Sequence, residues 1–165
     1  MHVRAATLDD AVAICRIYNA GIAERNATFE TRLRSPAEVA QWFDGRHPIV
    51  VVEETGAVIA FAATSSYRPR ECYAGIAEFS VYVDPDARGR KAGRLAMAAL
   101  LAAAEQAGFW KLVSRVFVEN STSRRLLAAV GFREVGVYEH HAQLDGVWRD
   151  VVIVERLLGR AVASS

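Results

Sequence analysis

The sequence predicts a mixed α/β fold: one twisted sheet of about six to seven strands, flanked on both faces by about four helices. Short β-rich runs alternate with segments of helical periodicity, in the order β-α-α-β-β-β-α-β-α-β-β. The strand–helix–strand unit over residues 78–118 needs a crossover, so its strands should be parallel, while hairpins elsewhere favour antiparallel pairs. With 165 residues, we expect a single domain over 1–165, ending in a flexible tail from about residue 159 to 165.

The first half of the chain contains three predicted strands and two predicted helices. Residues 2–6 form a short strand, and residues 7–22 form a helix with Thr7 as N-cap and acidic residues in its first turn. Residues 24–34 are polar and are expected to form a loop. Residues 35–45 carry a Ser N-cap, Pro at the first helical position, Glu at the third and a Gly stop, which indicates a short helix. Residues 48–67 form two β-rich runs around Thr55-Gly56, typical of a hairpin.

The second half begins with a loop over 68–75 and a strand over 76–84. Residues 88–108 form a turn and then a helix that ends at Gly108. Its segment 95–104 is apolar on all sides, which predicts that this helix is largely buried. A strand follows over 111–118, then a short helix within 119–132 closed by Gly131. Residues 133–158 form a closing hairpin that turns at Asp145-Gly146.

The overall charge excludes several kinds of partner. Twenty basic and 19 acidic residues give a net charge of +1, so we expect neither nucleic acid nor an anionic membrane as a partner. The longest near-apolar stretch, 95–104, is too short to cross a bilayer, and nothing at the N-terminus resembles a signal peptide. A cytoplasmic protein with reduced thiols is the simplest interpretation. Cys15 is expected in the core, and Cys72 has no neighbouring His to make it catalytic.

A cationic, glycine-bearing turn joins the strand at 76–84 to the helix that follows it. A helix start presents free backbone N–H groups and a positive dipole end, which together bind anions such as phosphate. Gly89 and Gly93 allow close approach of the backbone, and four cations surround them: Arg88, Arg90, Lys91 and Arg94. The alternative is a solvated basic helix start, but cations there oppose the helix dipole. The spacing fits neither a P-loop nor a dinucleotide-binding loop.

These residues resemble the acyl-CoA pyrophosphate loop of the GNAT superfamily of N-acetyltransferases. That loop has Arg or Gln first, Gly three residues later and Gly or Ala at the end. Arg88 fits the first position and Gly93 the last, while Lys91 stands where the family has Gly. The segment 119–132, "ENSTSRRLLAAVGF", resembles the second signature of the superfamily, with Asn120 and Ser123 in its polar positions. The resemblance implies an acetyl-CoA site formed by Val81, Tyr82, Val83, Arg88, Gly89, Arg90, Lys91, Ala92, Gly93, Arg94, Asn120 and Ser123.

A narrower resemblance covers nearly the whole chain. The segments "IYN", "ATFET", "YRPRECY", "AEFSVYV" and "DGVWRDV" are similar to the phosphinothricin N-acetyltransferase family, which includes enzymes that acetylate arsinothricin and methionine sulfoximine. The resemblance implies a homodimer, a general base at Glu78, and backbone N–H groups at 81–83 that hold the thioester oxygen. It also implies a substrate pocket formed by Phe29, Arg68, Arg70 and Tyr73.

The residues themselves suit these roles, although each has a plainer alternative. A carboxylate at Glu78 could take a proton from a substrate ammonium; otherwise it is a solvated edge residue. Arg68 and Arg70 suit a small doubly anionic substrate, because guanidinium pairs with carboxylate or phosphinate bidentately. Their alternative is a basic surface loop, and that of Phe29 is ordinary core packing.

Two observations leave the chemistry incomplete. Many GNAT enzymes carry Tyr, and some relatives His, seven residues after the motif asparagine, where it protonates the departing thiolate. Here that position is Leu127, so the general acid is unassigned, and water or the ammonium proton could serve. His140 and His141 are strand neighbours that should face opposite sides, neither with a partner, so no metal site is expected.

Three functions therefore stay open at this level. The first is acetyl transfer to the α-amino group of a small acidic amino-acid analogue, as in detoxification or resistance. The second is transfer to another acceptor, such as a protein N-terminus, a lysine or a polyamine, although the Arg68 and Arg70 loop argues against a polyamine. The third is a non-catalytic acyl-CoA sensor, which Leu127 favours and Glu78 disfavours.

Overall fold

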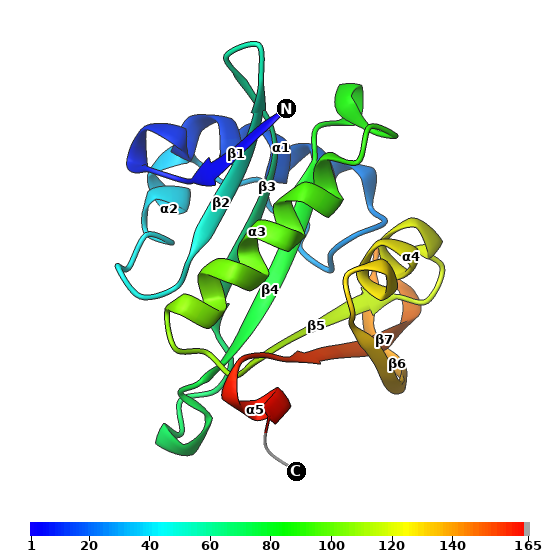
Figure 1. Ribbon diagram of the computed structural model, residues 1–165. Helices are drawn as coiled ribbons and strands as arrows, with labels where there is room; N and C mark the ends of the chain where they lie inside the picture. The colour runs from blue at the N-terminus through cyan, green and yellow to red at the C-terminus, as the bar shows by residue number, and fades with distance from the viewer. Residues whose placement is uncertain (164–165) are drawn as a thin grey trace.

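The computed structural model describes residues 1–163, and these form a seven-stranded mixed sheet in the order β1-β2-β3-β4-β5-β7-β6 (Figure 1). The strands are β1 His2–Ala5, β2 Ile49–Glu54, β3 Ala57–Ser66, β4 Ile76–Val83, β5 Lys111–Phe117, β6 Arg133–Leu144 and β7 Val147–Leu157. The helices are α1 Ala11–Glu24, α2 Pro36–Ala40, α3 Ala92–Gln106, α4 Ser121–Ala129 and α5 Arg160–Ala163. The predicted fold class and order of elements are confirmed.

The pairing of the strands follows the prediction from the crossover. β4 and β5, which α3 connects, are parallel, and the other neighbouring pairs in the sheet are antiparallel. The two predicted hairpins turn at Thr55-Gly56 and Asp145-Gly146, where both residues of each pair have positive φ. This geometry matches the right-handed twist of the flanking strands.

The sheet is covered on both faces because its central strands are buried on both sides. Along β2, Val50 and Val52 belong to the core under α3, whereas Ile49 and Val51 belong to the core that α1 and α2 cover. Such alternation follows from the two-residue period of a strand. Figure 1 shows α3 crossing one face of β2–β4, with α1 and α2 behind.

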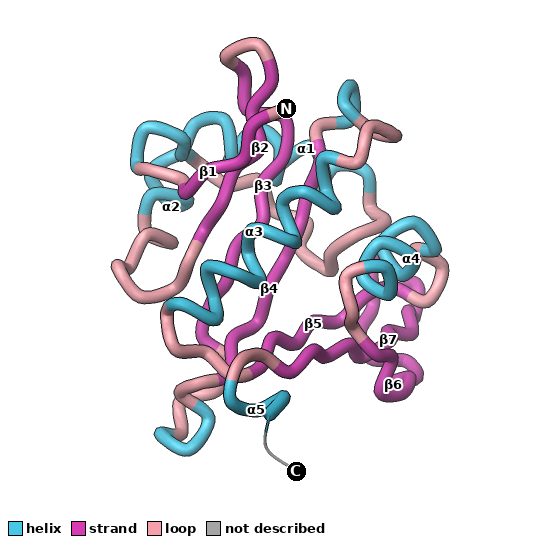
Figure 2. The backbone as a smooth tube through the Cα atoms, in the orientation of Figure 1, coloured by secondary structure: helices cyan, strands magenta, loops and turns pink. Residues whose placement is uncertain are grey.

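The parallel pair β4–β5 is short and opens into a fork. Only three register pairs join the strands: Ile76↔Lys111, Ala77↔Leu112 and Glu78↔Val113. Beyond them β4 continues beside β3, while β5 turns away beside β7 (Figure 2). At the closed end of the fork, the Trp110 N–H donates to the Gly75 carbonyl over 2.8 Å. A Cβ on Gly75 would lie 2.0 Å from the Trp110 ring, so the ring can pack there only against glycine.

Helix starts are fixed by the signals seen in the sequence. At α2, the Glu38 N–H donates to the Ser35 hydroxyl over 3.3 Å, and Pro36 occupies the first helical position. Before α1, the Thr7 N–H donates to the buried Asp10 carboxylate over 2.8 Å. That carboxylate also accepts two bonds from Arg4, of 2.8 and 2.9 Å, which hold the pKa of Asp10 below its usual range.

Helix α3 is less buried than its composition suggests. Its inner face, including Met97 and Leu100, is fully buried, but Leu95 is 40% exposed, and Ala98 and Ala102 are also exposed. The prediction of a largely buried helix is confirmed for the face toward the sheet and α4, which buries seven residues, but not for the outward face, where small alanines cost little in water. Of the tail expected over 159–165, residues 160–163 form α5 and the last two residues lie outside the described part; its flexibility stays a prediction.

Candidate active site

A cavity of about 790 Å³ opens at the fork between β4 and β5. Its walls come from the loop after α1, the ends of β3 and β4, strand β5, the start of α4 and the bulged part of β6. Of the residues predicted for the site, the following line it: Phe29, Glu78, Val81, Tyr82, Asn120 and Ser123. The cavity therefore brings together residues that the sequence assigned to acetyl-CoA, such as Val81 and Asn120, and residues that it assigned to the acceptor and its chemistry, Phe29 and Glu78.

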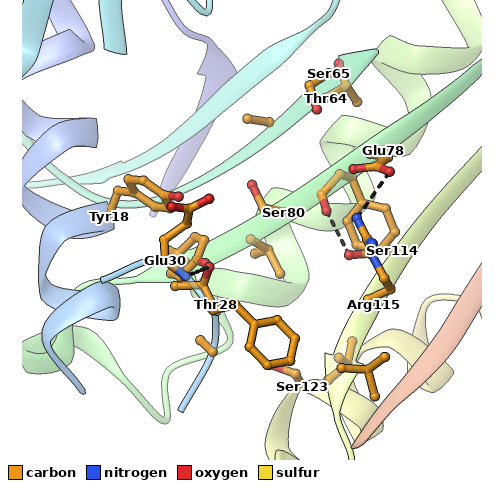
Figure 3. A pocket seen from close by; sticks show the side chains of 18 of the residues that line it. Tyr18, Thr28, Glu30, Thr64, Ser65, Glu78, Ser80, Ser114, Arg115 and Ser123 are labelled. Atoms are coloured by element: carbon orange, nitrogen blue, oxygen red, sulfur yellow. Dashed lines mark hydrogen bonds and ion pairs between the residues drawn. The ribbon is translucent and has the colours of Figure 1, made fainter. Parts of the chain in front are cut away.

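An acid–base cluster lies at one end of the cavity. Arg115 of β5 places Nη2 3.5 Å from Glu78 Oε1 and Nη1 3.4 Å from His141 Nε2. In Figure 3, Glu78, Ser114 and Arg115 lie together on one side, Tyr18, Thr28 and Glu30 on the other, and Ser80 between them. The Glu78 side chain is 34% exposed and that of Arg115 49% exposed, so both reach solvent from the cavity.

The main chain of β4 presents polar groups to the fork. The Phe79 carbonyl accepts a 2.9 Å bond from the Ser114 hydroxyl of β5, whereas the Asp84 N–H donates to Ile59 of β3. Because alternate residues of a strand direct their N–H and C=O groups to opposite edges, Val81 and Val83 also face the β5 side. No strand among the described residues pairs with them there, since the β5 ladder ends at Glu78. The backbone of Tyr82 faces β3 instead.

Aromatic side chains from α1, the loop after it and both strands of the fork form part of the cavity wall. The Phe29 ring packs edge-on against Phe117 at 4.8 Å between centroids, and Tyr18 packs edge-on against Tyr82 at 5.2 Å. Burial raises the pKa of both tyrosine phenols above the usual value. They are therefore neutral hydroxyl groups at neutral pH, each able to donate one hydrogen bond.

The glycine-bearing turn adopts a left-handed backbone before α3. Gly89 has φ +79° and Lys91 φ +67°, and Lys91 is the N-cap of the helix. The sequence led us to expect a backbone tolerable to a non-glycine residue at Lys91. Lys91 lies in the left-handed region, which is allowed for L-residues but occupied mainly by glycine, so its conformation is tolerated at some cost in energy. The lysine side chain is exposed, as expected.

Two of the four cations in this turn are already paired. Arg88 Nη2 lies 2.5 Å from Glu24 Oε1 at the end of α1, and Arg90 Nη1 lies 2.6 Å from Glu54 Oε2 at the end of β2. Arg16 of α1 likewise holds Asp84, just before the turn, at 2.5 Å. The argument that four cations at a helix start demand an anion is weaker than the sequence indicated, because acids on neighbouring elements offset part of that charge.

The second signature segment lies beside the fork. The Asn120 carboxamide oxygen accepts a 3.2 Å bond from the Ser123 N–H and so caps α4. Leu127, in the position where many relatives carry Tyr, lines the cavity and is 2% exposed. A Cβ on Gly93 would lie 2.8 Å from Leu126 Cδ1, so glycine lets α3 and α4 approach each other.

The structure does not bring the predicted substrate loop into the cavity. Arg68, Arg70 and Tyr73 are exposed and lie beyond the end of β3, none of them among the lining residues. The Tyr73 ring packs against Tyr67, and the Arg68 guanidinium lies 4.9 Å from the Tyr67 ring centre. The hydrogen bond and the charge of Tyr67 raise the pKa of Arg68 above its usual value.

Sequence reasoning missed Arg115 and His141. His141 reaches Arg115 because β6 is bulged: Tyr138 pairs with Val151 and Ala142 with Arg149, so Asp150 alone opposes residues 139–141. The bulge, in which His140 has φ +45°, breaks the strict alternation of side chains that was expected along this strand. One signal for Arg115 was present: an arginine in the middle of the strand segment "KLVSRVFV", with apolar residues after it.

Residues 1–163 contain neither a metal-binding cluster nor a membrane-spanning helix. No group of three or more His, Cys, Asp or Glu side chains in this part of the chain is arranged to bind a metal ion. Its helices also lack the length and apolar character needed to span a bilayer.

Comparison with known proteins gives a consistent family. The sequence model of the Acetyltransferase (GNAT) family matches residues 16–132. Phosphinothricin N-acetyltransferase of Alcaligenes faecalis is 34% identical, over 94% of this chain and 82% of that protein. L-methionine sulfoximine/L-methionine sulfone acetyltransferase of Pseudomonas paraeruginosa is 30% identical, over 93% of this chain and 92% of that protein.

Solved structures agree with the sequence comparisons. The phosphinothricin acetyltransferase of Sinorhizobium meliloti, solved in complex with acetyl-CoA, superposes with a TM-score of 0.90 at 30% identity. The match covers 99% of this chain and 91% of the other.

Proposed function

Because this chain belongs to the GNAT family and is an acetyl-CoA-dependent N-acetyltransferase, we propose that its acceptor is the α-amino group of a small acidic amino acid. The proposed acceptors are phosphinothricin, methionine sulfoximine and arsinothricin, and the proposed role of the enzyme is detoxification or resistance. The observation that carries the proposal is the Glu78–Arg115 pair inside a cavity that opens onto the β4–β5 fork.

The fork and the turn before α3 fit an acyl-CoA. Val81 and Val83 offer unpaired backbone groups where a pantetheine chain can lie as a substitute for the missing strand. The first N–H groups of α3 and the left-handed turn at Gly89 and Lys91 suit a pyrophosphate. Asn120 and Ser123, from the second signature segment, line the cavity. When bound, acetyl-CoA supplies an acetyl thioester.

The reaction requires a neutral amine and stabilisation of negative charge at the carbonyl oxygen. Glu78 acts as general base and takes a proton from the acceptor ammonium, directly or through one water. The N–H of Val81 or Val83, directed into the fork, donates to the oxygen on which negative charge develops. Leu127 carries no proton, so the departing thiolate takes its proton from the amine nitrogen, which is positively charged after attack, or from water. No residue of the chain becomes covalently acylated.

The acceptor lies between the acid–base cluster and the aromatic wall. Phe29 contacts its aliphatic part, and the loop that carries Arg68, Arg70 and Tyr73 contacts its outer acidic head group. Because these three side chains do not line the cavity, a longer acceptor or movement of the loop is needed for contact. The two guanidinium groups of the loop suit an acidic head group that extends out of the cavity, because guanidinium pairs with such groups bidentately.

A thiol-release assay tests the proposal. Purified protein with acetyl-CoA is offered phosphinothricin, methionine sulfoximine, arsinothricin, the common amino acids, a polyamine and a peptide with a free N-terminus. We expect CoA release with at least one of the three analogues at a kcat/KM at least tenfold above that for the polyamine or the peptide. Preference for the polyamine or the peptide would overturn the acceptor class. Binding of acetyl-CoA without release across the panel would indicate a sensor.

We further propose that the protein is a cytoplasmic homodimer. β6 is an edge strand, and apolar side chains on the β6–β7 hairpin are exposed, among them Val137 (52%), Tyr138 (53%) and Trp148 (53%). An edge strand with exposed apolar residues favours pairing with a second copy. Sedimentation should show a dimer that Val137→Lys dissociates; a monomeric parent protein would contradict this. The free thiols of Cys15 and Cys72 suit a reducing compartment.

A further inference from the structure

Arg115 is the one arginine or lysine among the described residues that line the cavity. The cavity has three acidic side chains, and two of them are paired with residues outside its lining. Glu30 pairs with Arg34 at 2.8 Å, and Asp44 with His47 at 2.6 Å. Glu78 alone has its cationic partner, Arg115, inside the cavity.

The contacts of Arg115 leave most of its hydrogen-bonding capacity free for a ligand. Each of its two polar contacts, to Glu78 and His141, is a single long contact of 3.4–3.5 Å. A guanidinium has five N–H donors and binds a carboxylate best through two parallel short bonds. Half-exposed ion pairs with one long contact contribute little to stability. The Glu78–Arg115 pair is therefore easily exchanged for better contacts with a bound molecule.

An α-amino acid is the charge complement of this pair. Its ammonium and its carboxylate are separated by one carbon, and the two charged groups of the protein lie 3.5 Å apart on neighbouring strands. Glu78 and Val113 are register partners across the parallel ladder, so the spacing of the pair is fixed by the closed end of the fork. Figure 3 shows both side chains turned to the same side of the cavity.

We infer that Arg115 binds the α-carboxylate of the acceptor and, in doing so, releases Glu78 to accept the proton of the adjacent ammonium. The inference rests on the proposed function and deepens it, because it makes a free α-carboxylate a requirement for the acceptor. The contact between Arg115 Nη1 and His141 Nε2, at 3.4 Å, is nearly as long as the 3.5 Å contact with Glu78, so it leaves the guanidinium free to turn to a carboxylate.

Removing Arg115 should abolish discrimination for the α-carboxylate. The assay compares phosphinothricin and methionine sulfoximine, each with its α-methyl ester, for the parent protein and for Arg115→Ala, Arg115→Lys and Arg133→Ala. We expect the parent to prefer the free acid and Arg115→Ala to reduce the acid-to-ester ratio of kcat/KM at least tenfold, mainly through KM of the acid. Arg115→Lys keeps the charge but not the fork of donors, so it should lie between.

Arg133→Ala is the matched control, since Arg133 pairs with Glu155 on the surface, away from the cavity. It should keep the parent ratio. Thermal melting and acetyl-CoA binding by calorimetry establish that each variant is folded. An equal fall on acid and ester in Arg115→Ala would assign Arg115 to positioning of Glu78 and overturn the inference, leaving the proposed function intact. A parent protein that acetylates neither these two acids nor arsinothricin would overturn the proposed function and this inference with it.

Discussion

The two sides of the cavity are assembled in different ways. The cofactor side, where acetyl-CoA is proposed to bind, relies on backbone groups of two short segments: the turn and first helical turn over 89–94, which lie outside the cavity lining, and the start of α4. The acceptor side uses side chains from segments far apart in the chain, such as Phe29, Glu78, Arg115 and His141. Main-chain recognition tolerates substitution, which explains how lysine can stand at a glycine position. Side-chain recognition depends on each residue, so single changes there should have larger effects.

The largest expected effect is on the acceptor side, at the proposed base. Glu78→Gln keeps the shape but cannot take a proton, so we expect kcat/KM for the acceptor to fall at least about 100-fold. Acetyl-CoA affinity, measured by calorimetry, should stay unchanged, because the cofactor side is separate. Glu134→Gln removes a surface acid paired with Arg124 and serves as the control. Unchanged turnover in Glu78→Gln would remove Glu78 from the mechanism.

A substitution at the closed end of the fork, which both sides share, should lower the free energy of unfolding. Gly75→Ala places a Cβ where the rigid Trp110 ring now lies, so either the ring or β4 must move. Overpacking of this kind destabilises by about 1–3 kcal/mol, which urea unfolding monitored by tryptophan fluorescence would measure. Gly136→Ala introduces the same methyl group into open space at a glycine without a positive φ, so it is the matched control. Equal losses in both variants would argue against the clash.

A substitution at Asp10, remote from both sides of the cavity, should affect stability without affecting catalysis. The pKa of Asp10 is lowered by its bonds to Arg4, so its contribution is present above the unfolded-state value of about 3.9 and is lost as pH falls through the lower folded value. Asp10→Asn should lower stability by about 1–2 kcal/mol at pH 7 and flatten the acid limb of the stability–pH curve. Kinetic constants for both substrates should stay unchanged. A parallel shift of the whole curve with no change of slope would contradict the titration account.

The smallest expected effect is on the cofactor side, at Lys91. A left-handed conformation costs an L-residue about 1–2 kcal/mol, and glycine's greater chain entropy offsets about 0.5–1 kcal/mol of the relief. Lys91→Gly should therefore stabilise the protein slightly, by about 0.5 kcal/mol, seen as a small rise in Tm. Acetyl-CoA affinity should change less than about threefold. A loss of tenfold or more would show that the lysine charge contributes to binding.

The same contrast explains what the sequence could predict. The elements, the parallel crossover and both hairpins follow from local signals such as the capping box at Ser35 and Glu38. The Arg88–Gly93 turn is recognisable because its residues are contiguous. The partners of Arg88 and Arg90, Glu24 and Glu54, were not predictable, since they belong to other elements.

The acceptor side was predicted only in part. Glu78 and Phe29 were found through a family resemblance, and both line the cavity. Arg115 and His141 meet only because a bulge in β6 shifts the register over residues 139–141. A register shift changes which side chains meet while leaving the strand's composition intact, so hydrophobic patterning carries no trace of it.

The fork also bears on how this protein avoids aggregation. A sheet normally exposes unpaired backbone only at its outer strands, where foreign chains can attach. Here an additional unpaired edge, at Val81 and Val83, lies inside the molecule. The fork narrows to ordinary strand spacing at Gly75 and Trp110. Helix α4 lies on the β5 side of its open end (Figure 1). The narrow end of the fork is therefore closed by the chain's own backbone, whereas the edge at Val81 stays open to the cavity.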